Sequence, residues 1–145
     1  MQMHIASNPT MDKVSRLLGQ CGLPSDDIFP EYLPNFVLAR DGGSDVGVAG
    51  LQILGSTALV RSVAVVPTHR SRGLATKLLA AIEQRARSQG VKQLFLLTND
   101  AQAFFAAHGY KELPRSSAPS EIQGCSQFRS SCCGAATLML KQAEA

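Results

Sequence analysis

The stretch Val63-Ala64-Val65-Val66-Pro67-Thr68-His69-Arg70-Ser71-Arg72-Gly73-Leu74-Ala75 decides the fold that we expect. An apolar run comes first, a short turn follows, and the turn leads into a long segment from Ser71 to Gln89. Apolar residues recur in that segment at spacings of three and four, which is typical of a helix, and Gly90 supplies a C-terminal cap. The stretch therefore predicts a buried strand, a tight turn and a helix in direct succession.

The turn has the chemical features of an anion-binding site. The first N–H groups of a helix have no partner inside it, and the aligned peptide dipoles favour negative charge there. Gly73 lets an anion approach the backbone, small Ala75 keeps the next turn open, and Arg70 and Arg72 add positive charge. A lone glycine turn beside solvated arginines would be a weak signal. The apolar strand before it, and a further strand and helix after it, favour a ligand site.

The segments on either side of this stretch predict a mixed sheet. Ala58–Val66 is almost wholly apolar, so we expect it in the middle of the sheet, and only Arg61 and Ser62 interrupt it. Lys92–Leu97 follows the long helix, and this order implies a right-handed crossover to a parallel neighbour. Further strands are expected at Phe36–Asp41, Val46–Leu54, Tyr110–Leu113 and Ala136–Leu140, and helices at Thr10–Gly22, with Thr10 as N-cap, at Asn99–His108 and, as short pieces, within 25–33 and 122–131.

Length and composition bound the class of protein. The chain has 145 residues, of which 45% are hydrophobic and 17% charged, so we expect one globular domain spanning residues 1–145. The net charge of +3 is mild and its basic residues are scattered, which argues against nucleic acid. No apolar run approaches a membrane span and the N-terminus does not resemble a secretory signal, so we expect a cytoplasmic protein without a membrane partner. Cys21, Cys125, Cys132 and Cys133 form no C-x-x-C pair, so no metal site is expected.

Arg70, Gly73 and Ala75 match a known signature, which is Arg or Gln, two residues, Gly, any residue, then Gly or Ala. On these residues the chain resembles the GNAT superfamily of N-acetyltransferases. The resemblance implies an α/β (α+β) fold, with a mixed and twisted sheet of about six or seven strands and helices on both faces. It also implies acetyl-CoA as cosubstrate, no metal, and direct attack of a primary amine on the thioester.

The resemblance also implies which residues hold the coenzyme. The N–H groups from Ser71 to Thr76 would bind the pyrophosphate, and the backbone of the preceding strand would pair with the pantetheine arm like an added strand. An N–H near Val65 would polarise the thioester oxygen. The expected coenzyme-binding residues are Val63, Ala64, Val65, Arg70, Ser71, Arg72, Gly73, Leu74, Ala75, Thr76, Thr98, Phe104 and Phe105.

A second family signature resembles residues 98–110 and departs from the pattern at two positions. Thr98 replaces the usual Asn, and Phe105 replaces the Tyr that commonly protonates the coenzyme A thiolate. Phe105 cannot be an acid, but general acid help contributes only about 10² to 10⁴-fold, so we expect a working enzyme that takes a proton from water or another side chain. His108, Glu31 and Glu121 are the candidates, although His108 also suits a partner for the helix C-terminus.

A narrower resemblance concerns the acceptor. Residues 58–65 and other segments are similar to arsenic-resistance-associated acetyltransferases, which implies a small amine-bearing toxin such as an organoarsenical amino acid. Arg61, as a fork for a carboxylate, and Ser62 are the expected substrate residues, unless Arg61 pairs with an acid of the fold. A non-catalytic acyl-CoA-binding module, a protein or peptide acetyltransferase, a thiol-based arsenite binder using Cys125, Cys132 and Cys133, and a homodimer stay open.

Overall fold

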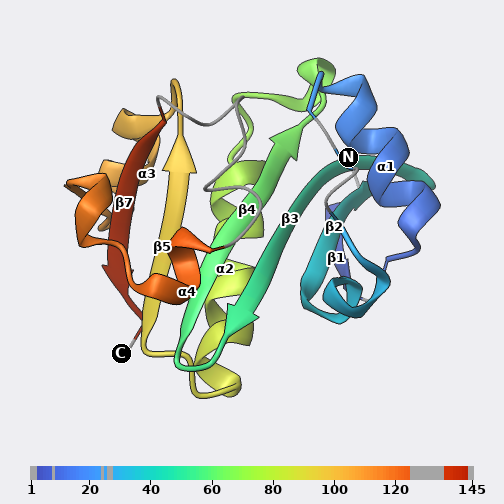
Figure 1. The fold of residues 1–145 in the computed structure, drawn as a ribbon. Helices are drawn as coiled ribbons and strands as arrows, with labels where there is room; N and C mark the ends of the chain where they lie inside the picture. Colours follow the sequence, from blue (N-terminus) through green and yellow to red (C-terminus); the bar gives the residue numbers. More distant parts are fainter. Residues whose placement is uncertain (1–2, 8, 24, 26–27, 125–135, 144–145) are drawn as a thin grey trace. The chain divides into compact units, whose positions relative to one another are not determined.

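The computed structural model describes residues 3–7, 9–23, 25, 28–124 and 136–143. Seven strands form one sheet in the order β1-β2-β3-β4-β5-β7-β6 (Figure 1). Only the β4–β5 pair is parallel among the strand pairs whose register is described, which makes the sheet mixed. The strands are β1 Met3–Ser7, β2 Phe36–Asp41, β3 Ser44–Leu54, β4 Thr57–Val65, β5 Gln93–Thr98, β6 Lys111–Leu113 and β7 Thr137–Gln142. The helices are α1 Met11–Gln20, η1 Pro30–Asn35, η2 Pro67–His69, α2 Leu74–Ser88, α3 Gln102–Ala107, η3 Arg115–Ser117 and α4 Ser120–Gln123.

The chain forms two compact units, one made of Met1–Gln52 with Arg61–Arg85 and the other of Ile53–Val60 with Ala86–Ala145. The expectation of a single domain stays a prediction. Within the described residues, no helix combines the length and the hydropathy that crossing a bilayer requires.

In the first unit, α2 packs closely on β3. A Cβ added to Gly47 would lie 2.8 Å from the Leu78 Cδ1, and one added to Gly50 would lie 2.4 Å from the ring of Phe36. A Cβ at Gly50 would therefore displace the ring of Phe36, whereas one at Gly47 would require the end of the Leu78 side chain to shift. Buried apolar residues on α2, among them Leu78 and Ile82, fill the core of this layer.

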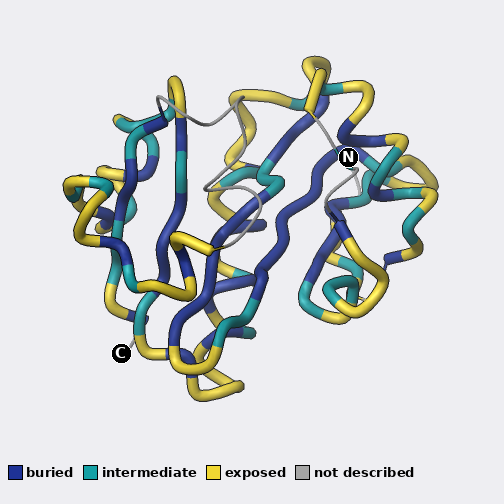
Figure 2. The backbone as a smooth tube through the Cα atoms, viewed as in Figure 1, coloured by how far each residue is buried: buried dark blue, intermediate teal, exposed yellow. Residues whose placement is uncertain are grey.

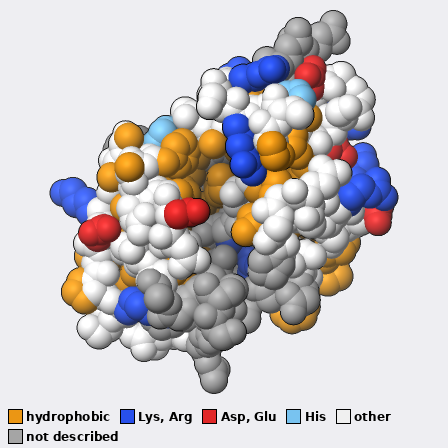
Figure 3. Space-filling model, turned by 90° about the horizontal axis from the view of Figure 1, so that it is seen from above, with side chains coloured by type: hydrophobic (Ala, Val, Ile, Leu, Met, Phe, Trp, Pro, Cys, Tyr) orange, Lys and Arg blue, Asp and Glu red, His pale blue; other side chains and the backbone are white. Residues whose placement is uncertain are grey.

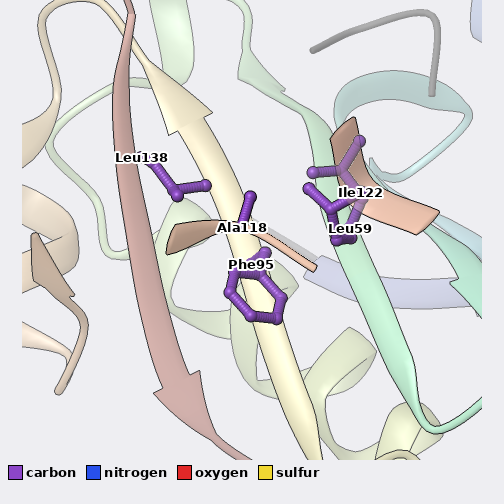
Figure 4. Packing of buried hydrophobic residues seen from close by; sticks show 5 residues of the cluster. All are labelled: Leu59, Phe95, Ala118, Ile122 and Leu138. Carbon is purple, nitrogen blue, oxygen red and sulfur yellow. The ribbon is translucent and has the colours of Figure 1, made fainter. Parts of the chain in front are cut away.

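In the second unit, the beginning of β4 pairs in parallel with β5 through Thr57 to Val60. Leu59, Phe95 and Leu138 from these strands and β7 pack against Ala118 and Ile122 (Figure 4). β5 and the beginning of β4 are largely buried, whereas the three residues of β6 are exposed or half-buried (Figure 2). The short segment that contains α4 thus covers the sheet in this unit.

Most elements predicted from the sequence are confirmed, with shifts that have physical causes. β2 has the predicted bounds, and Thr10 caps α1 by accepting a bond from the Lys13 N–H at 3.3 Å. α2 begins at Leu74 rather than Ser71, because Ser71 and Gly73 have positive φ and cannot be helical. β1 was not predicted, because it is a largely exposed edge strand without the apolar alternation of a half-buried one.

Candidate coenzyme and acceptor site

In the loop between η2 and α2, the backbone angle φ alternates in sign from residue to residue. Ser71 has φ 65° and Gly73 has φ 77°, whereas Arg70 has φ −72° and Arg72 also stays outside the positive range. Arg70 is extended, so the two left-handed residues turn the chain sharply between η2 and the start of α2. Ser71 is one of two residues other than glycine with positive φ in the described chain. A left-handed residue other than glycine costs roughly 1–2 kcal/mol, so the loop stores backbone strain.

The helices α1 and α2 differ in the residue that precedes their first turn. The Gly73 carbonyl accepts the first helical bond, from the Lys77 N–H at 3.2 Å, so the helix itself offers no acceptor to the three N–H groups that follow. Thr10 fills the equivalent place on α1 with its side chain, but Gly73 has no side chain to do so. A Cβ on Gly73 would meet nothing within 4 Å. The amides of Leu74, Ala75 and Thr76 therefore begin a helix whose own cap residue leaves room for a ligand.

The segment leading into this loop is tied to the sheet. The Val66 N–H donates to the Val46 carbonyl at 2.9 Å, and the Arg70 Nε donates to the Val65 carbonyl at 2.8 Å. The side chain of Arg70 therefore reaches back to β4, and part of its work is structural. Other Lys and Arg side chains are scattered rather than gathered in one patch on the face toward which β4 runs (Figure 3).

β4 changes its geometry in the middle, at the polar pair that interrupts its apolar sequence. Ser62 has φ 59°, and the register with β5 covers Thr57 to Val60 only. Such an irregularity bends a strand and redirects the side chains beside it. Val63 is half-buried, and Ala64 and Val65 are buried.

Arg61 lies in a buried polar cluster at this irregularity. Its side chain is 4% exposed, its Nη1 lies 3.4 Å from the Gln52 Oε1, and its Nε donates to the Ser62 Oγ at 3.2 Å. Gln52 is also buried, at 7% exposed. A buried guanidinium is tolerated only when surrounding groups bond to it and compensate its charge. Gln52 was not predicted as part of the site, since a single polar residue in β3 gives no signal of its own.

Phe105, in the second unit, is a buried aromatic side chain without a group that could donate a proton. It is 7% exposed and lies edge-on to Phe104 and Tyr110, with ring centroids 5.1 Å and 5.6 Å apart. Thr98 is buried, and its Oγ1 accepts a bond from the Ala101 N–H at 3.0 Å, which holds the turn before α3. This turn is the reason that α3 begins at Gln102 and not at Asn99.

His108 is placed as a partner for the C-terminus of α3. Its Nδ1 lies 2.8 Å from the Phe104 carbonyl, and its ring lies 4.5 Å from that of Phe104. A carbonyl only accepts, so Nδ1 carries the proton of this bond and Nε2 is the acceptor nitrogen of the neutral ring. The geometry fits the structural interpretation of His108.

The other candidates divide into three cases. Glu121 has an Oε1 3.5 Å from the Thr57 Oγ1, so its carboxylate lies at the beginning of β4 and not at the Ser62 irregularity. Glu31 is exposed in the first turn of η1.

Cys125, Cys132 and Cys133 lie outside the described residues. Within the described ranges, no three His, Cys, Asp or Glu side chains come together as a metal site would require.

These features define a class of protein. It is an α/β domain in which a central strand enters a loop of alternating φ, and the loop opens onto the N-terminus of a long helix. The family model described as an acetyltransferase (GNAT) domain matches residues 33–112. That is more than half of the chain, and the chain therefore belongs to the GNAT acetyltransferase family.

Known proteins resemble the chain in sequence or in fold. An amino-acid acetyltransferase of Pseudomonas fluorescens (strain Pf0-1) is 34% identical over 89 residues, which are 60% of this chain and 21% of the relative. N-acetylglutamate synthase from Neisseria gonorrhoeae, complexed with coenzyme A and N-acetyl-glutamate, has a similar fold, with TM-score 0.84 and 19% identity over 100% of this chain and 36% of that one. The ribosomal-protein-S18-alanine N-acetyltransferase from Escherichia coli has TM-score 0.73 and 17% identity, over 99% and 96% of the two chains. The chain thus spans only a part of the first two proteins.

Proposed function

We propose that the protein is an N-acetyltransferase that moves the acetyl group of acetyl-CoA to the primary amine of a small, amino-acid-like molecule. One observation carries the proposal. The loop of alternating φ opens onto an α2 N-terminus whose cap residue, Gly73, has no side chain and faces empty space. Family membership through residues 33–112 supports the same chemistry.

The proposed pyrophosphate site consists of the amides from Ser71 to Thr76. A diphosphate would accept bonds from N–H groups for which α2 itself has no acceptor, and the helix dipole adds attraction. Arg72 is exposed at this loop and contributes positive charge. Ala75 is half-buried and small, so the first turn of α2 stays accessible.

The proposed pantetheine site is the backbone of Val63, Ala64 and Val65. The register of β4 with β5 ends at Val60, and Ser62 has a left-handed backbone directly afterwards. A linear amide chain can then bind along a strand edge in the way that an added strand does. Thr98, Phe104 and Phe105 are proposed as further coenzyme contacts by analogy with the family.

The reaction that we propose is a direct transfer. The neutral amine attacks the thioester carbonyl, an N–C bond forms, the C–S bond breaks and the sulfur leaves as a thiolate. The amine nitrogen loses a proton and the thiolate gains one. Holding two reactants in line can supply about 7–11 kcal/mol, whereas acid-base help contributes about 10² to 10⁴-fold. We therefore expect the absence of a hydroxyl at Phe105 to slow the reaction without abolishing it, with water or another side chain exchanging protons.

The proposed acceptor carries a carboxylate beside its amine. Arg61 is a buried cation beside the left-handed Ser62 of β4, and a planar guanidinium matches a carboxylate in two bonds. The similar protein from Pseudomonas fluorescens is an amino-acid acetyltransferase, which favours the same class of acceptor. An organoarsenical amino acid belongs to this class, in keeping with the resemblance to arsenic-resistance-associated enzymes. We also propose that the protein is cytoplasmic and that it forms a homodimer.

A thiol-release assay tests the proposal. Acetyl-CoA is mixed with pairs of acceptors, each pair made of an amino acid and the matching amine that lacks the α-carboxylate. We expect coenzyme A release above the hydrolysis rate with at least one amino acid, and at least tenfold less with its partner amine. Tight binding of acetyl-CoA without release for any acceptor would instead favour a non-catalytic acyl-CoA-binding module, which the buried Phe105 would suit.

A further inference from the structure

His69 forms a chain of contacts that the proposed chemistry does not use. It occupies the last position of η2, directly before the loop of alternating φ. Its Nε2 lies 2.9 Å from the Asp41 Oδ2, and its Nδ1 lies 2.9 Å from the Thr68 Oγ1. The side chains of His69 and Asp41 are 17% and 26% exposed, so water screens this pair less than a surface ion pair.

The chemistry of the three groups fixes the direction of the bonds. An ionised carboxylate only accepts, so the His69 Nε2–H donates to Asp41. The Nδ1 then accepts from the Thr68 hydroxyl when the ring is neutral and donates to it when the ring is charged. The chain Asp41-His69-Thr68 can therefore hold in both protonation states of the ring.

Because of the position of Asp41, the contacts of His69 connect the loop to the sheet. Asp41 is the last residue of β2 and is paired with Met3 of β1 and with Ser44 of β3, so it is fixed to the sheet. His69 is adjacent to Arg70, where the strained loop begins. The segment is also held by the Val66 N–H on Val46 and by the Arg70 Nε on Val65. Among these ties, only the His69 contact crosses to the end of β2.

We propose that Asp41 and His69 form a latch that positions the loop Arg70–Gly73 for the diphosphate, with His69 as a positioning residue and not a catalytic one. The inference rests on the proposed function. A loop already fixed in its binding conformation loses less entropy when the ligand binds, so the latch strengthens coenzyme binding without touching the coenzyme. It leaves the chemical step unchanged.

Trypsin cleavage within the loop measures how firmly the loop is held in its conformation. Arg70 and Arg72 are exposed, and trypsin cleaves after each of them once the segment can leave its fixed conformation. In H69A and D41A we expect cleavage at these two sites, identified by mass spectrometry, to be about fivefold faster or more. The control D12A removes an ion pair with Arg16 on α1, whose side chains are 68% and 76% exposed, and it should not change the rate at these sites.

Calorimetry with coenzyme A and steady-state kinetics complete the test. We expect H69A and D41A each to weaken coenzyme binding about tenfold and to raise the KM for acetyl-CoA with an unchanged kcat, and the double variant to be no weaker than either. H69Q restores a donor to Asp41 and should recover most of the binding. Wild-type protein that does not bind coenzyme A would overturn the proposed function. Wild-type binding together with normal cleavage and normal affinity in H69A and D41A would overturn only the latch.

Discussion

Gly73 and Gly90 stand at the two ends of α2 with nearly the same backbone. Their φ values are 77° and 80°, and a Cβ would meet nothing within 4 Å at either position. Gly90 closes the helix, because its N–H bonds to the Arg87 carbonyl and the Val91 N–H bonds to the Ala86 carbonyl. Gly73 opens the helix toward the proposed ligand. The two glycines therefore share a conformational demand and differ in function.

This pair gives a matched test. Substituting alanine at either position forces a left-handed alanine, so we expect G73A and G90A each to lower the free energy of unfolding by about 1–2 kcal/mol in urea titrations. Only G73A adds a methyl group over the proposed diphosphate site, and we expect it alone to weaken coenzyme A binding, by at least tenfold in calorimetry. Equal affinities in the two variants would contradict the placement of the site.

A second prediction at the scale of single residues concerns Arg61. R61K keeps the charge but loses the planar fork, so we expect the KM for an amino-acid acceptor to rise about tenfold while the KM for acetyl-CoA stays within twofold. R85K is the control, because the Arg85 Nε donates to the Asn35 Oδ1 and no role in acceptor binding is proposed for Arg85. If R61K leaves both KM values unchanged, Arg61 does not bind the acceptor.

At the scale of elements, the bend of β4 rests on the left-handed Ser62. Glycine adopts this conformation freely but is also more flexible when unfolded, so we expect S62G to change stability by less than about 1 kcal/mol. S62V places a β-branched residue at positive φ and should destabilise by about 2 kcal/mol or more and weaken coenzyme binding. Equal unfolding free energies for S62G and S62V would show that the irregularity is not built on this residue.

The elements also show what a sequence can predict and what it cannot. The amphipathic pattern of α2, the apolar run of β4 and the N-cap Thr10 are local signals, and each predicted its element within a few residues. The left-handed backbone at Ser62 and Ser71 has no such signal, because serine gives no preference for it. The contacts of His69 with Asp41, and of Arg61 with Gln52, join residues far apart in the chain and needed the fold.

At the scale of the whole molecule, binding should stabilise the folded chain. Coenzyme A at about a hundred times its Kd adds about 2.7 kcal/mol to the free energy of unfolding, which corresponds to a rise in Tm of several degrees. If the chain is one domain, as its length predicts, calorimetry should record one transition whose calorimetric and van't Hoff enthalpies agree. Two separate transitions, with only one shifted by coenzyme A, would contradict the single domain.

Amide NMR with coenzyme A and pantetheine tests the central claim most directly, because the two ligands share the thiol arm and differ in the diphosphate. We expect coenzyme A to shift the amide signals of Ser71 to Thr76, and pantetheine at the same concentration to leave them nearly unchanged. Signals in this segment that do not respond to coenzyme A, or that respond equally to both ligands, would contradict a diphosphate site at the N-terminus of α2.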